Sequence, residues 1–311
     1  ILTQQTSAEI RQTAVALGLF DGVHIGHRAV LKAAVACQRE GLLPAAFTMQ
    51  TPSVCMKHGE PLRYLYPDAV KQRLLEENGI ACVVSPAFAD IAEMDGETFC
   101  SVYLQQQMRA KKLFCGRDFR FGKRAAWGVA DLQQFGRQMG FTVEVVAAVR
   151  QDGDVISSSR IRQLLLDGNV AQAARLLGVP YQISGVVQHG AALGRTLQFP
   201  TINLPFAVGQ LVPLHGVYRT KVYLMDGSVW DGVTNIGVKP TVSKEPIPIA
   251  ETHLLGYHGD LYGQTCRLEL LEFLREEQKF SSLKELKAAI ARDIKTVQQY
   301  DKQPMSYSLD G

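Results

Sequence analysis

The sequence predicts two domains of different architecture: an α/β domain with a doubly wound parallel sheet, then a small antiparallel β-barrel with a C-terminal helix. The chain has 311 residues, enough for about two domains of roughly 150 residues. Short apolar runs alternate with helical patterns from Val15 to about Leu177. From Ile183 to Phe273 the runs are β-branched and punctuated by glycine. The change near Val179-Pro180 predicts domains at 1–180 and 181–311.

Strands and helices alternate in the predicted N-terminal domain. Apolar runs predict strands at Ala14–Leu19, Leu43–Thr48, Ile80–Ser85, Lys112–Cys115 and Thr142–Val149. Helical patterns occupy Arg28–Glu40, Ala69–Glu77, Gly96–Met108, Asp131–Met139, Ser159–Leu166 and Val170–Leu177. This β-α-β alternation is typical of a parallel sheet with helices on both faces.

Short strands and turns dominate the second half. Closely spaced runs such as GVYRTKVYL and CRLELLEFL predict a small barrel or sandwich. Asp226-Gly227 joins two alternating runs and predicts a hairpin turn. Ser282 and Glu285 form a capping-box pattern before a final helix. We expect Leu283, Leu286, Ile290 and Ile294 on its buried face.

Composition excludes several classes of protein. The chain is 46% apolar and 20% charged, which argues against disorder and coiled coil. The net charge of +3 is scattered rather than clustered, so we expect no nucleic-acid partner. The longest stretch without charge, Thr196–Tyr218, contains three prolines, so we expect no membrane span. A monomer or weak homo-oligomer is the expected assembly.

The cysteines indicate a reducing compartment. None of the six forms a C-x-x-C pair, and five lie in the first half among apolar residues, so we expect free buried thiols. The first residues, ILTQQTSAEIRQ, lack a basic segment followed by an apolar one, as a signal peptide would have. The expected location is the cytoplasm.

A candidate phosphate site follows the first predicted strand, in the segment GLFDGVHIGH from Gly18 to His27. It opens a helix, whose free N–H groups and partial positive charge attract anions. Gly22 and Gly26 would let a phosphate approach the backbone, while His24 and His27 share one side of a helical turn. Helix capping by these histidines is the alternative. The full candidate set is Gly18, Phe20, Asp21, Gly22, His24, Gly26 and His27.

A second candidate phosphate segment is ISSSRIR, at 156–162. Consecutive hydroxyls lead into a helix start, and guanidinium groups follow. The candidates are Ser157, Ser158, Ser159 and Arg162. Ordinary capping by Ser158 or Ser159 is the alternative.

These motifs carry a resemblance. GLFDGVHIGH followed by ISSSRIR resembles the nucleotidyltransferases, whose domain is Rossmann-like. The stretch Gly116–Gly122, GRDFRFG, is similar to one in the bacterial bifunctional riboflavin kinase/FAD synthetase family. The resemblance implies that Asp118, Phe119 and Phe121 bind the flavin. Alternating Phe119 and Phe121 would offer apolar surface beside a planar ring, although a plain strand end is the alternative.

The C-terminal half resembles riboflavin kinases through Gly194–Asn203, GRTLQFPTIN. The resemblance implies that Gly194 and Arg195 bind ATP and that Glu251, in the segment ETHLL, is the catalytic base. Thr201 and Asn203 offer oxygen ligands two residues apart, a type that Mg²⁺ accepts. A turn at Thr201–Asn203 and a solvated Glu251 are the alternatives.

The resemblance implies two reactions in sequence. The riboflavin 5′-hydroxyl attacks the γ-phosphate of MgATP and gives FMN; the FMN phosphate then attacks the α-phosphate of a second ATP and gives FAD and pyrophosphate. The second step needs no protein nucleophile because the FMN phosphate is largely ionised, with a second pKa of about 6. Catalysis then consists of alignment and stabilisation of charge, by His24, His27 and the ISSSRIR segment.

One segment departs from the family pattern. The family shows Phe-acidic-Pro-x-Pro after the second strand, whereas this chain has Phe47-Thr48-Met49-Gln50-Thr51-Pro52. A riboflavin kinase with an impaired adenylyltransferase half is therefore an alternative. A flavin- or nucleotide-responsive binding protein is another, although a pure binder has no need of Glu251 as a base. Gln198 and Ile202 also replace the family's glycine and alanine.

Overall fold

The computed structural model describes residues 11–51, 55–57, 60–189, 199, 201–239 and 247–300. The chain divides into two units, Ile1–Arg160 with Val208–Gln210, and Ile161–Ala207 with Leu211–Gly311. This division falls within one helix, α6 (Ser158–Leu166). The domain boundary at 180/181 stays a prediction, and each unit is described by itself.

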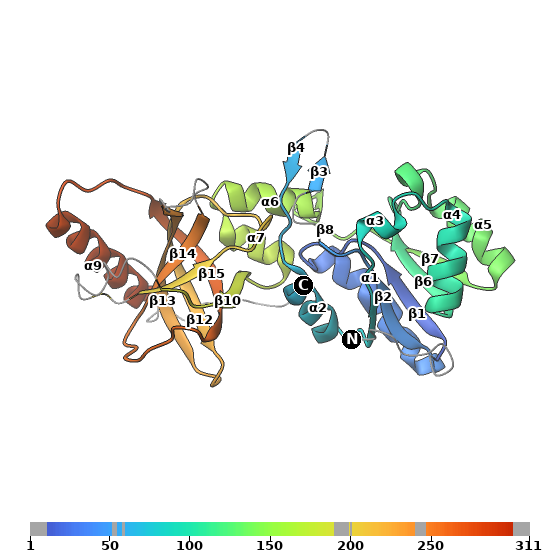
Figure 1. Ribbon diagram of the computed structural model, residues 1–311, viewed down its shortest axis with the longest axis horizontal. Helices are drawn as coiled ribbons and strands as arrows, with labels where there is room; N and C mark the ends of the chain where they lie inside the picture. Colours follow the sequence, from blue (N-terminus) through green and yellow to red (C-terminus); the bar gives the residue numbers. More distant parts are fainter. Residues whose placement is uncertain are drawn as a thin grey trace. The chain divides into compact units, whose positions relative to one another are not determined.

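A five-stranded parallel sheet forms the centre of the first unit, in the order β5-β2-β1-β6-β7 (Figure 1). The strands are β1 (Thr13–Leu17), β2 (Leu43–Phe47), β5 (Cys82–Val84), β6 (Ala110–Gly116) and β7 (Thr142–Val146). All five predicted strands are confirmed. Strand β1 is buried along its whole length, as the apolar run without alternation predicts.

Helices lie on both faces of this sheet. They are α1 (Ile25–Ala36), α2 (Asp68–Glu77), α3 (Phe88–Ile91), α4 (Gly96–Phe99) and α5 (Val129–Met139). The predicted helix Gly96–Met108 changes form along its length: α4 is followed directly by a π-helix, η2 (Cys100–Gln107). The predicted helix Arg28–Glu40 likewise ends in 3₁₀ form, η1 (Cys37–Glu40). A further 3₁₀ turn is η3 (Lys123–Ala125).

Two small hairpins were not predicted from the sequence. They pair β3 (Cys55–Lys57) with β4 (Glu60–Leu62), and β8 (Arg150–Gln151) with β9 (Asp154–Val155). Helix α6 follows β9, and α7 (Val170–Leu177) ends at Gly178 in the left-handed conformation. Both helices match the predicted segments.

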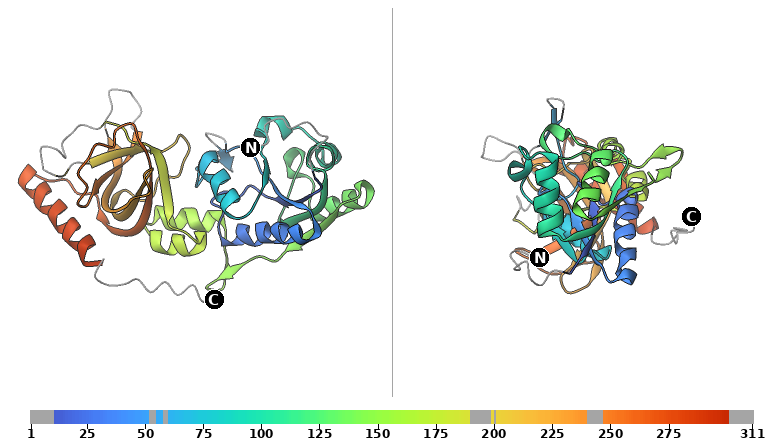
Figure 2. Two further views of the ribbon diagram at one scale, coloured as in Figure 1. Left: turned by 90° about the horizontal axis from the view of Figure 1, so that it is seen from below. Right: turned by 90° about the vertical axis from the view of Figure 1, so that its right-hand side faces the viewer.

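The second unit is built on an antiparallel sheet of order β10-β15-β12-β13-β14-β11, which curls on itself (Figure 2). Its strands are β10 (Tyr181–Val186), β11 (Thr201–Pro205), β12 (Gly216–Leu224), β13 (Val229–Lys239), β14 (Ile247–Leu254) and β15 (Thr265–Glu276). The Gln188 N–H donates to the Asn203 carbonyl at 2.9 Å. This bond joins the two edges of the sheet, so the predicted barrel is confirmed, as is the hairpin turn at Asp226-Gly227.

Three threonine hydroxyls form a chain inside the curled sheet. Thr220 Oγ1 and Thr252 Oγ1 each lie 2.8 Å from Thr234 Oγ1. All three side chains are fully buried. Hydroxyls can both donate and accept, so each satisfies its neighbour without water.

Helix α9 (Leu283–Tyr300) packs against the barrel. Val297 contacts the cluster of Val217 and Val233, and Arg275 binds Asp293 at 2.8 Å. Half of the predicted capping box is confirmed, since the Glu285 N–H donates to Ser282 Oγ at 3.3 Å, whereas Glu285 Oε2 accepts the N–H of Ser281 at 3.0 Å. Leu283 was wrongly expected on the buried face: it is 59% exposed because it lies in the first turn.

The described thiols match the expectation from sequence. The structure gives Cys37, Cys82, Cys100, Cys115 and Cys266 as free and buried. Burial raises the pKa of Cys100 to about 12, so this thiol is unreactive at neutral pH. Within the described ranges, no helix combines the length and apolarity needed to cross a bilayer.

Candidate functional site

A strained turn links β1 to α1 in the first unit. Phe20 and Val23 have φ of 49° and 42°, and Gly22 has φ of 87°. Such left-handed backbone is costly outside glycine and concentrates at functional loops. A Cβ added at Gly18 would lie 3.2 Å from the Phe20 ring, so a side chain there would press on Phe20.

The two histidines stack at the helix N-terminus. His24 is the N-cap of α1, and its Nδ1 accepts the His27 N–H at 3.2 Å. The two ring centroids are 3.5 Å apart. A Cβ at Gly26 would approach the His24 ring to 3.1 Å, which explains the glycine. His24 therefore caps the helix, which is the alternative reading of this residue. Capping uses only its Nδ1 and leaves its Nε2 for another contact.

Burial, and then the neighbouring His24, hold the pKa of His27 well below its ordinary value. His27 is therefore neutral at pH 7. Its Nδ1 is buried and has no hydrogen-bond partner among the described residues. A buried polar atom of this kind needs a partner, which a ligand or water would supply.

The two predicted phosphate segments meet in space. Ser158 Oγ donates to the Asp21 carbonyl at 2.9 Å across 137 residues, and the Asp21 carboxylate accepts the Leu65 N–H at 2.8 Å. Ser157 caps α6, because its Oγ accepts the Arg160 N–H at 3.3 Å. Capping by Ser158 or Ser159, the alternative to phosphate binding, is therefore wrong, since the helix begins one residue earlier than predicted.

The rest of the second segment lies along α6. Ser159 is exposed in the first turn, and Arg162 is half-buried one turn later. Arg162 belongs to the second unit by its contacts. It is therefore described only by its position in α6.

An aromatic cavity of about 540 Å³ adjoins Gly18. The rings of Phe119 and Phe121 line it and stack at 5.8 Å, and Asp118 lies at its rim. The remaining lining includes Leu19, Phe47, Thr48, Met49, Phe88 and Phe99. Phe47 and Phe99 were not predicted as site residues. The position of Phe47 at the carboxyl end of β2, where ligands bind in such sheets, could have indicated it.

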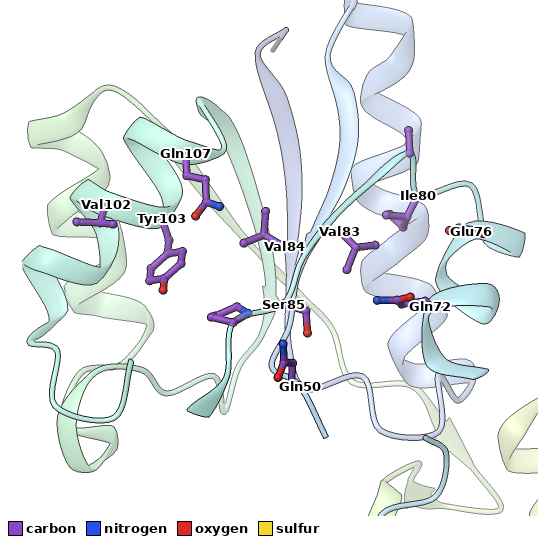
Figure 3. A pocket seen from close by; sticks show the side chains of 12 residues that line it. Gln50, Gln72, Glu76, Ile80, Val83, Val84, Ser85, Val102, Tyr103 and Gln107 are labelled. Atoms are coloured by element: carbon purple, nitrogen blue, oxygen red, sulfur yellow. The ribbon is translucent and has the colours of Figure 1, made fainter. Parts of the chain in front are cut away.

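Another cavity, of about 450 Å³, opens at the edge strand β5. Gln50 and Ser85 lie at its centre, with Tyr103 of η2 on one side and Gln72 of α2 on the other (Figure 3). No sequence motif pointed to this cavity. Its neighbour Thr48, two residues before Gln50, lines the aromatic cavity instead.

Strand register assembles the candidate kinase residues in the second unit. Glu251 on β14 pairs with Asn203 on β11 and with Asn235 on β13. Directly opposed residues share one face of a sheet, so these side chains form a row. Thr201 Oγ1 donates to Glu251 Oε1 at 2.8 Å. Gly194 and Arg195 lie outside the described residues.

A cavity of about 340 Å³ begins at Thr201. Tyr257, Asp260 and Tyr262 line it, and the Tyr262 ring stacks on His189 at 3.8 Å. Aromatic side chains beside the polar row offer a stacking surface for a planar group. Of the residues that line this cavity, only Thr201 was predicted as a site residue from the sequence.

Comparison with known proteins assigns both units. A family model of riboflavin kinases matches residues 177–301, and one of FAD synthetases matches residues 6–160. The bifunctional riboflavin kinase/FMN adenylyltransferase of Escherichia coli K12 is 38% identical over 294 residues, covering 91% of each chain. The Haemophilus influenzae enzyme of that name is 34% identical, covering 92% of this chain and 94% of its own.

A solved structure also matches over nearly the whole chain. It is described as a macrolide-efflux protein from Streptococcus pneumoniae, with a TM-score of 0.81, 27% identity, and coverage of 94% of this chain and 96% of that one. The family models place the FAD synthetase region before the riboflavin kinase region along the chain. The chain therefore belongs to the bifunctional riboflavin kinase/FMN adenylyltransferases, enzymes of flavin biosynthesis that carry a FAD synthetase domain followed by a riboflavin kinase domain.

Proposed function

We propose that the chain converts riboflavin to FMN in its C-terminal domain and FMN to FAD in its N-terminal domain, using ATP in both steps. The observation that carries the proposal is the presence of two separate polar sites in one chain. One is the Glu251–Thr201 pair at 2.8 Å. The other joins the two phosphate segments through Ser158 and Asp21 beside an aromatic cavity.

In the kinase step, Glu251 would accept the proton of the riboflavin 5′-hydroxyl as that oxygen attacks the γ-phosphate of ATP. The new O–P bond forms FMN, and the bond to the β-phosphate oxygen breaks to release ADP. Positioning and charge neutralisation dominate such reactions. The cavity lined by Tyr257 and Tyr262 next to Thr201 suits the adenine ring.

The oxygen atoms of this site fit Mg²⁺. The Thr201 hydroxyl donates its proton to Glu251, which leaves its lone pairs for a cation. The Asn203 amide oxygen lies on the same face of β11, two residues away. Few protein oxygens together with phosphates and water suffice for this ion. Bound Mg²⁺ would neutralise charge on the transferred phosphoryl group.

In the adenylyl step, the FMN phosphate would attack the α-phosphate of ATP, and pyrophosphate would leave. The protein's part is to align the phosphates and to stabilise charge. Because His24 Nδ1 accepts the His27 N–H, the neutral His24 ring carries its proton on Nε2 and can donate it to a phosphate oxygen. Neutral His27 and the hydroxyl of Ser159 are the further donors proposed.

The aromatic cavity supports the assignment of the flavin ring to Asp118, Phe119 and Phe121. The stacked rings of Phe119 and Phe121 offer an apolar surface, and Leu19 is 59% exposed at the same cavity. Exposed apolar groups around a cavity commonly mark a ligand site. A flavin ring would cover them.

One experiment tests the whole proposal. The purified chain is incubated with riboflavin, ATP and Mg²⁺, and the flavins are separated by chromatography with fluorescence detection. We expect FMN first and FAD after it. FMN alone would indicate a kinase with an impaired adenylyltransferase half, and neither product would favour a flavin-responsive binding protein.

The remaining expectations from sequence stay predictions. They are a monomer or weak homo-oligomer, a cytoplasmic location, and no nucleic-acid or membrane partner. Light scattering after gel filtration measures the first, and salt-dependent retention on immobilised RNA would contradict the third.

A further inference from the structure

The segment Thr48–Thr51, here called the β2 loop, separates two cavities of the first unit. Thr48 and Met49 line the aromatic cavity, whereas Gln50 reaches into the cavity at the edge of β5 (Figure 3). The β2 loop is also where the sequence departs from the Phe-acidic-Pro-x-Pro pattern. Its conformation therefore sets one wall of the aromatic cavity without the first proline of that pattern, which would stiffen it.

The first half of the β2 loop is bonded to neighbouring strand ends. Thr48 N–H donates to the Val84 carbonyl at 3.0 Å, and Gln50 N–H donates to the Pro86 carbonyl at 2.9 Å. Thr48 Oγ1 donates to the Leu19 carbonyl at 2.9 Å. The last bond ties the loop to the strained turn after β1.

Helix α2 holds the second half through two charged side chains. The Asp68 carboxylate accepts the Thr51 N–H at 2.9 Å and the Thr51 hydroxyl at 2.7 Å. Lys71 Nζ donates to the Met49 carbonyl at 2.6 Å and to Thr51 Oγ1 at 3.1 Å. Lys71 also lies 3.0 Å from Asp68 Oδ1.

These bonds couple the loop to a buried charge. Lys71 is only 3% exposed, and an ammonium group out of water is strongly unfavourable without oxygen partners. Two of its oxygen partners, Met49 O and Thr51 Oγ1, belong to the β2 loop. A displaced loop would leave the ammonium with Asp68 alone, so the loop and the helix keep one arrangement.

We propose that Asp68 and Lys71 are positioning residues for the adenylyltransferase reaction: they fix the β2 loop so that Thr48 and Met49 form the cavity wall that binds the ring of FMN. This inference rests on the proposed function of the first unit. Neither residue touches the cavity itself, because neither Asp68 nor Lys71 is among the residues that line it.

The test is a set of variants assayed for conversion of FMN to FAD. Lys71→Met removes the charge at similar length, and Asp68→Asn weakens the contact with Thr51. We expect each to raise KM for FMN by about tenfold or more, the ratio that accompanies loss of a charged hydrogen bond. We expect kcat and KM for ATP to change by less than about threefold, because uniform binding of one substrate is what is lost.

A conservative pair makes the test specific to the loop contact. Thr51→Val removes the hydroxyl and should raise KM for FMN, whereas Thr51→Ser keeps it and should behave as the native chain. The matched control is Arg73→Met with Glu77→Gln, an ion pair at 3.6 Å between half-buried Arg73 and exposed Glu77 on the same helix, which should leave KM for FMN unchanged. The riboflavin kinase activity of each variant reports that the second unit is active, and an unchanged kcat for FAD formation reports that the first unit is folded.

Two results would overturn the inference. One is an unchanged KM for FMN in Lys71→Met and Thr51→Val. The other is a loss that affects kcat and KM for ATP as strongly as KM for FMN, which a general structural role would give. If Lys71→Met does not fold, the Thr51→Val and Thr51→Ser pair decides alone. A native chain that forms no FAD from FMN and ATP would contradict the proposed function instead, so the two failures are distinguishable.

Discussion

The two candidate sites are constructed in opposite ways. The adenylyltransferase site is made by backbone turns: Phe20, Gly22 and Val23 all have positive φ, and the His24 and His27 rings are packed on one another. The kinase site is made by regular strands, whose register places Asn203, Glu251 and Asn235 in one row. In the first site, the backbone conformation and the packing of neighbouring side chains position the groups. In the second, regular strands position the side chains.

This difference predicts how each site responds to substitution. A side chain on a strand can be replaced with little movement of its neighbours, so a variant loses one chemical group. In a packed turn, each residue also holds the others, so a variant changes the geometry as well. The predictions below separate the two sites, from the largest effect to the smallest.

Replacing Glu251 should have the largest and cleanest effect. Glu251→Gln keeps the size of the side chain but removes the base, so formation of FMN should fall by about 10²–10⁴-fold. Conversion of FMN to FAD should remain, because Glu251 lies in the other unit. The measurement is the rate of each half-reaction with its own substrate.

The control for this variant is Glu276→Gln, at an exposed position on β15. It should leave both rates unchanged. A Glu251→Gln chain that phosphorylates riboflavin at the native rate would remove Glu251 from the role of base.

His27→Asn should act on the other half-reaction. Loss of the ring removes a donor and also the support of His24, so FAD formation from FMN should fall by about 10²–10³-fold. The riboflavin kinase rate of the same chain serves as the internal reference. Equal loss of both activities would contradict the separation of the two sites.

Thr234→Val tests the scaffold of the kinase site rather than its chemistry. Thr234 is fully buried and is bonded to two other hydroxyls. The isosteric valine would leave both partners unsatisfied, so we expect the barrel to lose about 1–3 kcal/mol of stability. Hydrogen exchange followed by mass spectrometry would localise the loss to the barrel strands. Thr296→Val, on the exposed side of α9, is the matched control and should cost less than about 0.5 kcal/mol.

The contrast between the sites also explains what could be predicted from the sequence. Short apolar runs located the five parallel strands, most clearly β1, which is apolar and buried along its whole length. The candidate residues on GLFDGVHIGH and ISSSRIR were found because helix starts attract anions. Their meeting through Ser158 and Asp21 depends on chain topology, which local patterns do not encode.

Other features depended on contacts between distant residues. Helix α2 was predicted, but nothing in its pattern showed that Lys71 would be buried against Met49 and Thr51. Phe47 and Phe99 join the aromatic cavity only after β2 and α4 are packed. The π-helix η2 also escaped prediction, since its sequence has an ordinary helical pattern.

The smallest expected effect is a dependence of stability on pH that is confined to the first unit. Burial and His24 lower the pKa of His27 well below the ordinary 6.5, whereas the unfolded chain binds a proton near that value. Below about pH 6.5 the unfolded state therefore binds more protons, and stability falls as the pH decreases. Above that pH the contribution is constant.

The measurement is urea unfolding at several pH values between 7 and 5. The chain has two tryptophans, and Trp230→Phe leaves Trp127 of the first unit as the reporter. In this background the midpoint should decrease as the pH falls, and the added substitution His27→Gln should make the decrease shallower, because glutamine does not titrate. Equal slopes with and without His27 would mean that the ring is not held neutral by its surroundings. Burial in the first site would then not explain the protonation of His27, although that result would not contradict the stacking of the His24 and His27 rings.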